Sequence, residues 1–113
     1  MIIDTKLAIE KSNGNVELAK ELFLMLINEL PILLEKVKKA YQSGSTVELL
    51  ECTHQLHGST AYCAVPELKS VAQKLETTTK HADKNEILLR ITDVERAIQT
   101  LIKHSNDILK NNW

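Results

Sequence analysis

The stretch from His54 to Ser59 holds the residue types best suited to chemistry in this chain. At about 100° per residue on a helix, His54 lies about 160° from Leu56, on the face opposite the apolar side chains. A histidine in that position is not needed for packing. Because the unperturbed pKa of an imidazole is about 6.5, its neutral form offers a nitrogen lone pair near neutral pH. His54 is therefore a candidate nucleophile.

A glycine one turn after this histidine indicates that another molecule approaches here. Gly58 lies about 40° from His54 on the helical wheel, although Gly in a helix interior costs about 1 kcal/mol relative to Ala. The missing side chain leaves room beside the imidazole for the backbone of another protein. His57 and Glu51 flank His54 at about 60° each. Spacing alone leaves a second interpretation open, a surface histidine beside an accidental glycine.

The helix that carries these residues is predicted to run from Thr46 to Cys63. Ser45 and Glu48, three residues apart, form a capping box at its start. Its buried stripe is predicted to contain Leu49, Leu56 and Cys63, with four smaller residues beside them: Cys52, Thr53, Ser59 and Thr60.

Apolar residues at steps of three and four predict four further helices, at residues 5–11, 16–42, 66–79 and 84–109. Pro31 interrupts the second of these, but the apolar stripe continues in phase, so we expect one bent helix. Pro66 fits the first turn of the next. Long amphipathic helices joined by short loops predict an all-α fold, an antiparallel up-down four-helix bundle with a short extra N-terminal helix. Residues 1–113 are expected to form one domain.

Composition excludes several classes of function. The chain has 113 residues, 43% of them hydrophobic, and a formal net charge of −1, so it lacks the basic surface of a nucleic-acid binder. It has no 18-residue apolar run and no visible signal peptide, so we expect no direct membrane contact and a cytoplasmic location. A domain at the cytoplasmic end of an inner-membrane sensor kinase would have the same composition. Cys52 and Cys63, about 16 Å apart on one helix, are too distant for a disulfide. We expect both to be reduced and buried.

The residues His54-Gln55-Leu56-His57-Gly58-Ser59 resemble the signature of histidine-containing phosphotransfer (HPt) domains. The similarity extends to the long preceding helix with Phe23 and to Ala64–Leu68, which lead into a helix containing Leu75 and Glu76. It covers nearly the whole chain and is similar to the C-terminal HPt domain of BarA-type hybrid sensor histidine kinases.

This resemblance implies a role for each residue of the site. It makes His54 the phospho-acceptor, which takes a phosphoryl group from one receiver-domain aspartate and passes it to another in two-component signalling. Gly58 matches the family glycine, whereas His57 occupies the position usually held by Lys. Glu76 falls where the family places a Glu or Gln that hydrogen-bonds Nδ1 of the phospho-acceptor, and Gln73 is the alternative one turn earlier.

The same resemblance implies the partners and cofactors. The partners are the receiver domains of a hybrid sensor kinase and of a response regulator, and the chain is expected to be a monomer. It is a carrier without kinase activity of its own, in line with the absence of a phosphate-binding glycine loop or a nucleotide motif. It needs no cofactor, because Mg²⁺ belongs to the partner receiver. The second helix is expected to contribute to docking from its first half, together with Leu50, Glu51, Gln55, Ala61 and Tyr62.

Three other functions fit the residues less well. His54 and His57 could share a metal ion, but zinc normally needs further ligands, and Cys52 is expected to face the core while His81 and His104 show no convergence. A helical interaction module without phosphotransfer remains the main alternative. An acid/base enzyme is disfavoured because small bundles rarely offer a deep pocket.

Overall fold

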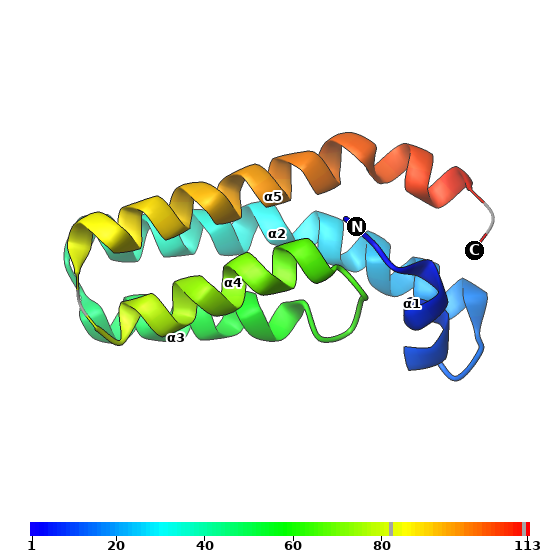
Figure 1. The fold of residues 1–113 in the computed structure, drawn as a ribbon, viewed down its shortest axis with the longest axis horizontal. Coiled ribbons are helices and arrows are strands. Elements are labelled where there is room, and N and C mark those ends of the chain that lie inside the picture. Colours follow the sequence, from blue (N-terminus) through cyan, green and yellow to red (C-terminus); the bar gives the residue numbers. More distant parts are fainter. Residues whose placement is uncertain (82, 112) are drawn as a thin grey trace.

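The structure, a computed structural model, describes residues 1–81, 83–111 and 113, and that part of the chain forms five helices and no strand (Figure 1). The helices are α1 (Thr5–Lys11), α2 (Val16–Ser43), α3 (Thr46–Ser59), α4 (Pro66–Thr79) and α5 (Lys84–Lys110). The predicted all-α class is confirmed. Helices α2 and α5 each end one residue later than predicted, and α2 continues through Pro31 as one helix.

Polar caps explain where most of these helices begin. The side chains of four residues each accept a hydrogen bond from a backbone N–H of the first turn that follows, which satisfies donors that a helix start leaves unpaired. These residues are Asp4, Asn15, Ser45 and Asp83. Helix α4 has no side-chain cap and begins instead with Pro66, whose missing N–H costs nothing in the first turn. Gly44 ends α2 in the left-handed conformation, with φ of 74°.

The four longer helices pack in a closed cycle, α2 against α3, α3 against α4, α4 against α5 and α5 against α2. Figure 1 shows each running opposite to its neighbours along one axis, with α1 near the start of α2. The 28 residues of α2 span about 42 Å at 1.5 Å per residue, close to the longest dimension of 43 Å. Helices α3 and α4 have 14 residues each and cover only part of that length.

Aliphatic side chains fill the space between the helices. The predicted stripes of α2 and α5 are buried throughout. The largest fully buried apolar side chains come from all four bundle helices and from the α3–α4 connection: Phe23, Leu30, Val37, Leu56, Val65, Leu68, Leu75, Val94, Ile98 and Leu101.

Helix α3 ends at Ser59, four residues before the predicted end at Cys63. The hydroxyls of Ser59 and Thr60 donate to the carbonyls of Leu56 and His57, at 2.6 and 2.7 Å, but Thr53 and Ser105 make the same bond inside α3 and α5, so these bonds alone do not end the helix. The chain then turns through the buried run Cys63–Val65 into Pro66, which disfavours a helical residue before it. The prediction failed because Cys63 is buried whether or not it is helical.

The two cysteines differ in burial. Both thiols are free among the described residues, and Cys63 is buried whereas Cys52 is only half-buried, so the expectation of two buried cysteines is wrong for Cys52. Burial raises the pKa of the Cys63 thiol to about 11. That thiol is therefore protonated near neutral pH.

Trp113 packs back onto the bundle. Its ring meets Phe23 edge to face, with 5.8 Å between centroids and an interplanar angle of 65°. Its Nε1–H donates to the carbonyl of Ile108 at 2.7 Å. Trp113 also contacts the small cluster formed by Ala8, Ala19 and Ala64, so it links the start of α2 to the end of α5.

Candidate histidine site on α3 and α4

One carboxylate on α4 binds both histidines of α3. Helices α3 and α4 pack side by side (Figure 1), which brings Glu76 opposite His54 and His57. His54 Nδ1 lies 2.6 Å from Glu76 Oε2, and His57 Nδ1 lies 2.8 Å from Glu76 Oε1. The three side chains thus form one cluster in which each carboxylate oxygen has its own imidazole partner.

The cluster is exposed at one histidine and covered at the carboxylate. The side chain of His54 is 77% exposed, that of His57 25% and that of Glu76 13%. An ionised carboxylate can only accept hydrogen bonds, so each Nδ1 must donate its N–H to Glu76. In a neutral imidazole this leaves Nε2 with a free lone pair. In its neutral form, His54 therefore presents an unprotonated Nε2 on a ring that stands in solvent.

The ionisation of Glu76 follows from its surroundings. Burial acts to raise the pKa of this carboxyl, but the hydrogen bonds from His54 and His57 and the attraction of their positive charge act in the opposite direction and prevail. The pKa of Glu76 therefore lies below its ordinary value. The carboxylate stays charged near neutral pH and remains an acceptor for both imidazoles.

Gly58 leaves open space on the surface of α3. A Cβ atom added there would meet no heavy atom of the described residues within 4 Å, so no packing contact inside the chain requires glycine at this position. The residue is exposed, one turn after His54. Because Gly58 has no side chain, the helix backbone next to the imidazole is accessible.

The other predicted site residues are mostly exposed. Gln73 is exposed on α4, and among the described residues the hydrogen bond to His54 comes from Glu76 instead. Leu50 is half-buried, and four further predicted contact residues are exposed: Glu51, Gln55, Ala61 and Tyr62.

A groove between α2 and the end of α3 contains the predicted docking residue Tyr62 and adds three residues that the sequence did not single out, Leu22, Met25 and Glu29. It has a volume of about 290 Å³, and its lining is mostly apolar: Leu22, Met25, Leu26, Glu29, Ser59, Tyr62 and Cys63. Met25 and Tyr62 are 63% and 67% exposed. The sequence offered one signal for Met25. It is an apolar residue that lies off the stripe of buried residues, spaced by three and four, that contains Phe23 and Leu26.

The other histidines and the cysteines do not join the cluster. His81 and His104 are exposed elsewhere, and the described ranges contain no group of three or more His, Cys, Asp or Glu side chains placed to hold a metal ion. Within the same ranges, no helix combines the length and the apolar character that a membrane crossing requires.

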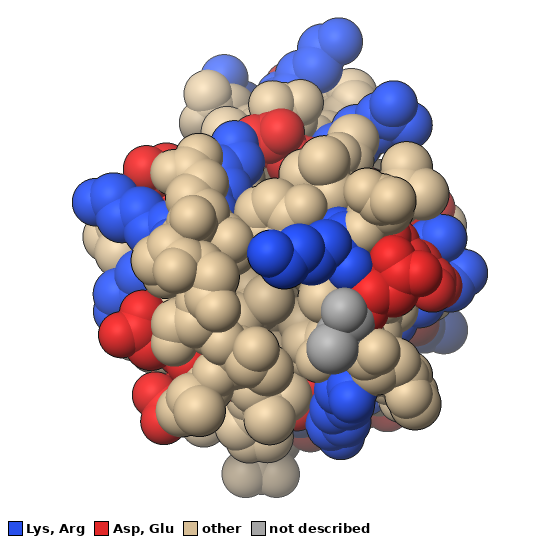
Figure 2. All heavy atoms as spheres, turned by 90° about the vertical axis from the view of Figure 1, so that its left-hand side faces the viewer, with Lys and Arg blue, Asp and Glu red and all other residues tan. Residues whose placement is uncertain are grey.

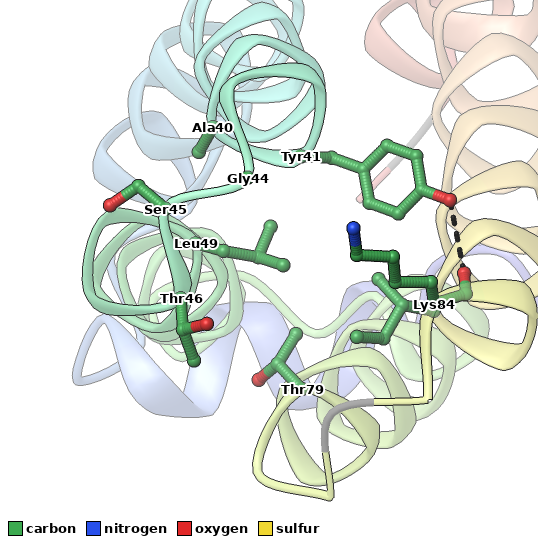
Figure 3. A pocket seen from close by; sticks show the side chains of 9 residues that line it. Ala40, Tyr41, Gly44, Ser45, Thr46, Leu49, Thr79 and Lys84 are labelled. Atoms are coloured by element: carbon green, nitrogen blue, oxygen red, sulfur yellow. Dashed lines mark hydrogen bonds between the residues drawn. The ribbon is translucent and has the colours of Figure 1, made fainter.

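A separate pocket of about 150 Å³ lies where the α2–α3 and α4–α5 connections meet. Tyr41 donates its hydroxyl to the carbonyl of Lys84 at 3.0 Å, and Figure 3 shows the Lys84 side chain extending into the pocket beside Tyr41. Figure 2 shows basic and acidic side chains interspersed over this end of the molecule. None of the predicted site residues lines the pocket.

The sequence of the chain matches the family model of the Hpt domain over residues 21–106. The match includes the whole His54–Glu76–His57 cluster and most of the bundle. The chain therefore belongs to the Hpt domain family, whose role is histidine phosphotransfer in two-component signalling.

Known relatives agree with this assignment. The chain is 33% identical over 82 residues, 73% of its length, to the sensor histidine kinase GacS of Pseudomonas protegens. It is 32% identical over 95 residues, 80% of its length, to the signal transduction histidine-protein kinase BarA of Escherichia coli K12. It spans only 9–10% of the length of these curated relatives.

A solved structure shows the same fold. The crystal structure of the HPT domain from a sensor hybrid histidine kinase of Shewanella superposes with a TM-score of 0.64, at 27% identity. The match covers 91% of this chain and 95% of that one. The bundle described above is therefore the fold of an HPt domain.

Proposed function

We propose that His54 is the phospho-acceptor of this Hpt domain and that its Nε2 atom forms the bond to phosphorus. The observation that carries this assignment is a 77% exposed imidazole whose Nδ1 lies 2.6 Å from the covered carboxylate of Glu76. His57 has the same tautomer but is only 25% exposed, so a large partner reaches His54 more easily.

The geometry of this cluster supports the following transfer step. The Nε2 lone pair of His54 attacks the phosphorus of an aspartyl phosphate, the P–O bond breaks, and its electrons leave on the aspartate carboxylate. The phosphorylated imidazole keeps its Nδ1–H and carries a positive charge, which the Glu76 carboxylate stabilises. Because such transfers pass through a loose, in-line transition state, positioning and charge stabilisation provide most of the catalysis.

Hpt domains work with receiver domains in hybrid-kinase phosphorelays. We propose that this chain accepts the group from the receiver of a hybrid sensor kinase and delivers it to the receiver of a response regulator, as a cytoplasmic monomer without kinase activity of its own. It needs no cofactor, and the Mg²⁺ and the acidic residues that bind it belong to the receiver.

The docking surface for a receiver extends from His54 across the open backbone of Gly58 to the α2–α3 groove. Met25 and Tyr62 offer exposed apolar area there, and Gly58 lets a partner backbone approach closely. Leu50, Glu51 and Gln55 on α3, and Ala61 just after its end, are the further contact residues that we propose for this surface.

Substitution of the phospho-acceptor tests the proposal. His54→Gln keeps a polar side chain of similar size but removes the nucleophile, so incubation with a phosphorylated receiver and Mg²⁺ should leave the variant unlabelled. The matched control, His104→Gln on α5, should accept the label at the wild-type rate. The wild-type label should be acid-labile and alkali-stable. Label that persists in His54→Gln, on His57 or elsewhere, would overturn the assignment.

A further inference from the structure

The shared carboxylate gives the second histidine a function of its own. We propose that His57 is a positioning residue that acts through Glu76: its Nδ1–H holds Oε1 so that Oε2 stays aimed at Nδ1 of His54. This inference rests on the proposed role of His54 as phospho-acceptor. His57 itself does not touch the phosphoryl group.

The need for such a residue follows from the side chain of Glu76. A glutamate has three rotatable side-chain bonds, so a single hydrogen bond to one oxygen leaves the carboxylate free to swing. The backbone of Glu76 is held within helix α4, and its carbonyl also accepts from the Thr79 hydroxyl at 2.6 Å. The second side-chain contact, from His57 at 2.8 Å, is the one that fixes the carboxylate plane.

The burial pattern of α3 supports this role. His57 is three residues after His54, so the two lie about 60° apart on the helix, and His57 is turned toward α4. Its side chain is 25% exposed, against 77% for His54. The more covered ring is therefore able to hold the carboxylate while the other stands free.

Packing behind the cluster keeps the two helices at a constant separation. The buried hydroxyls of Thr53 on α3 and Thr79 on α4 lie 3.5 Å apart, and both residues are almost inaccessible to solvent. Thr53 directly precedes His54 in sequence, and Thr79 lies one turn after Glu76. This buried contact, at the last residue of α4, lies next to the cluster and helps to set the distance from His57 to Glu76.

Two variants of His57 separate the hydrogen bond from bulk packing. His57→Asn keeps an N–H donor at the δ position of the side chain, whereas His57→Leu fills similar space without a donor. We expect His57→Leu to slow transfer from a phosphorylated receiver about tenfold at saturating receiver, with little change in KM, because misplaced groups lose rate even when binding is intact. His57→Asn should restore most of the rate.

Nitrogen NMR of the unphosphorylated protein provides a readout that does not depend on phosphotransfer. In wild type and in His57→Asn, the ring of His54 should show one dominant tautomer with protonated Nδ1, and in His57→Leu it should show a mixture of both. His81→Gln, outside the cluster, is the control. If His57→Leu retains the single tautomer, or if His57→Asn is as slow as His57→Leu, the inference is overturned. Failure of His54→Gln to abolish labelling would instead contradict the proposed function and leave the tautomer result standing.

Discussion

At the scale of single residues, the site depends on how Glu76 divides its two oxygens between two imidazoles. That arrangement makes a prediction for stability against pH. The pKa of Glu76 lies below its ordinary value, so its ionised form stabilises the folded state. This contribution is complete above the pKa of the unfolded chain, about 4.3, and is lost as pH falls through the lower pKa of the folded state.

Urea unfolding at a series of pH values measures this effect. The difference in free energy of unfolding between wild type and Glu76→Gln should shrink as pH falls from about 5 toward 3. Glu10→Gln, an exposed carboxylate on α1, should show no such trend. Parallel curves for wild type and Glu76→Gln would show that the histidines do not hold this carboxylate.

Gly58 allows docking and folding to be measured separately. A Cβ here meets no heavy atom of the described residues within 4 Å, and Ala is a better helix former than Gly by about 1 kcal/mol. Gly58→Ala should therefore raise the free energy of unfolding by up to about 1 kcal/mol while transfer becomes slower. Gly58→Val should slow transfer further. Transfer kinetics that stay unchanged in both variants would show that clearance beside His54 is irrelevant.

At the scale of elements, α2 contains a residue that opposes helix formation. Pro31 is exposed within this continuous 28-residue helix, and a proline in a helix interior removes one backbone hydrogen bond and costs about 3 kcal/mol. We expect Pro31→Ala to raise the free energy of unfolding by about 1–3 kcal/mol, measured by urea denaturation. The control Ile32→Ala, which changes an exposed neighbour, should have a small effect. A Pro31→Ala variant that is less stable than wild type would show that packing depends on the proline.

The elements also show what the sequence was able to predict. Helix starts were predictable because caps such as Ser45 and the proline at position 66 act locally, within one turn. The end of α3 was not, because the chain leaves the helix after Ser59 while the buried pattern continues to Cys63. The spacing of apolar residues predicts which residues are buried, but a buried residue need not lie in a helix.

At the scale of the whole molecule, the site exists only because α3 and α4 are neighbours in a closed cycle of helices. The pairing of His54 with Glu76 was predictable only from the family resemblance, since they are 22 residues apart and no local rule links them. The second contact, from His57 to the same carboxylate, was missed. It depends on the separation and rotation of two packed helices, which the pattern of either helix alone does not contain.

Trp113 connects α2 to the C-terminal end of α5. Its substitution tests whether this end of the bundle unfolds cooperatively with the rest. It is the only tryptophan of the chain and packs on Phe23 of α2 with 5.8 Å between ring centroids. Because it is half-buried, we expect Trp113→Ala to lower the free energy of unfolding by about 1–3 kcal/mol, less than full burial of an aromatic ring would give.

Its fluorescence shows whether this end unfolds with the rest. A small single domain usually unfolds in one step, so tryptophan emission and far-UV circular dichroism of the wild type should change at the same urea concentration. Trp113→Phe keeps an aromatic edge against Phe23 but loses the hydrogen bond to Ile108, and its stability should fall between those of wild type and Trp113→Ala. Emission that changes well before the helical signal would show that the end held by Trp113 opens independently of the α3–α4 site.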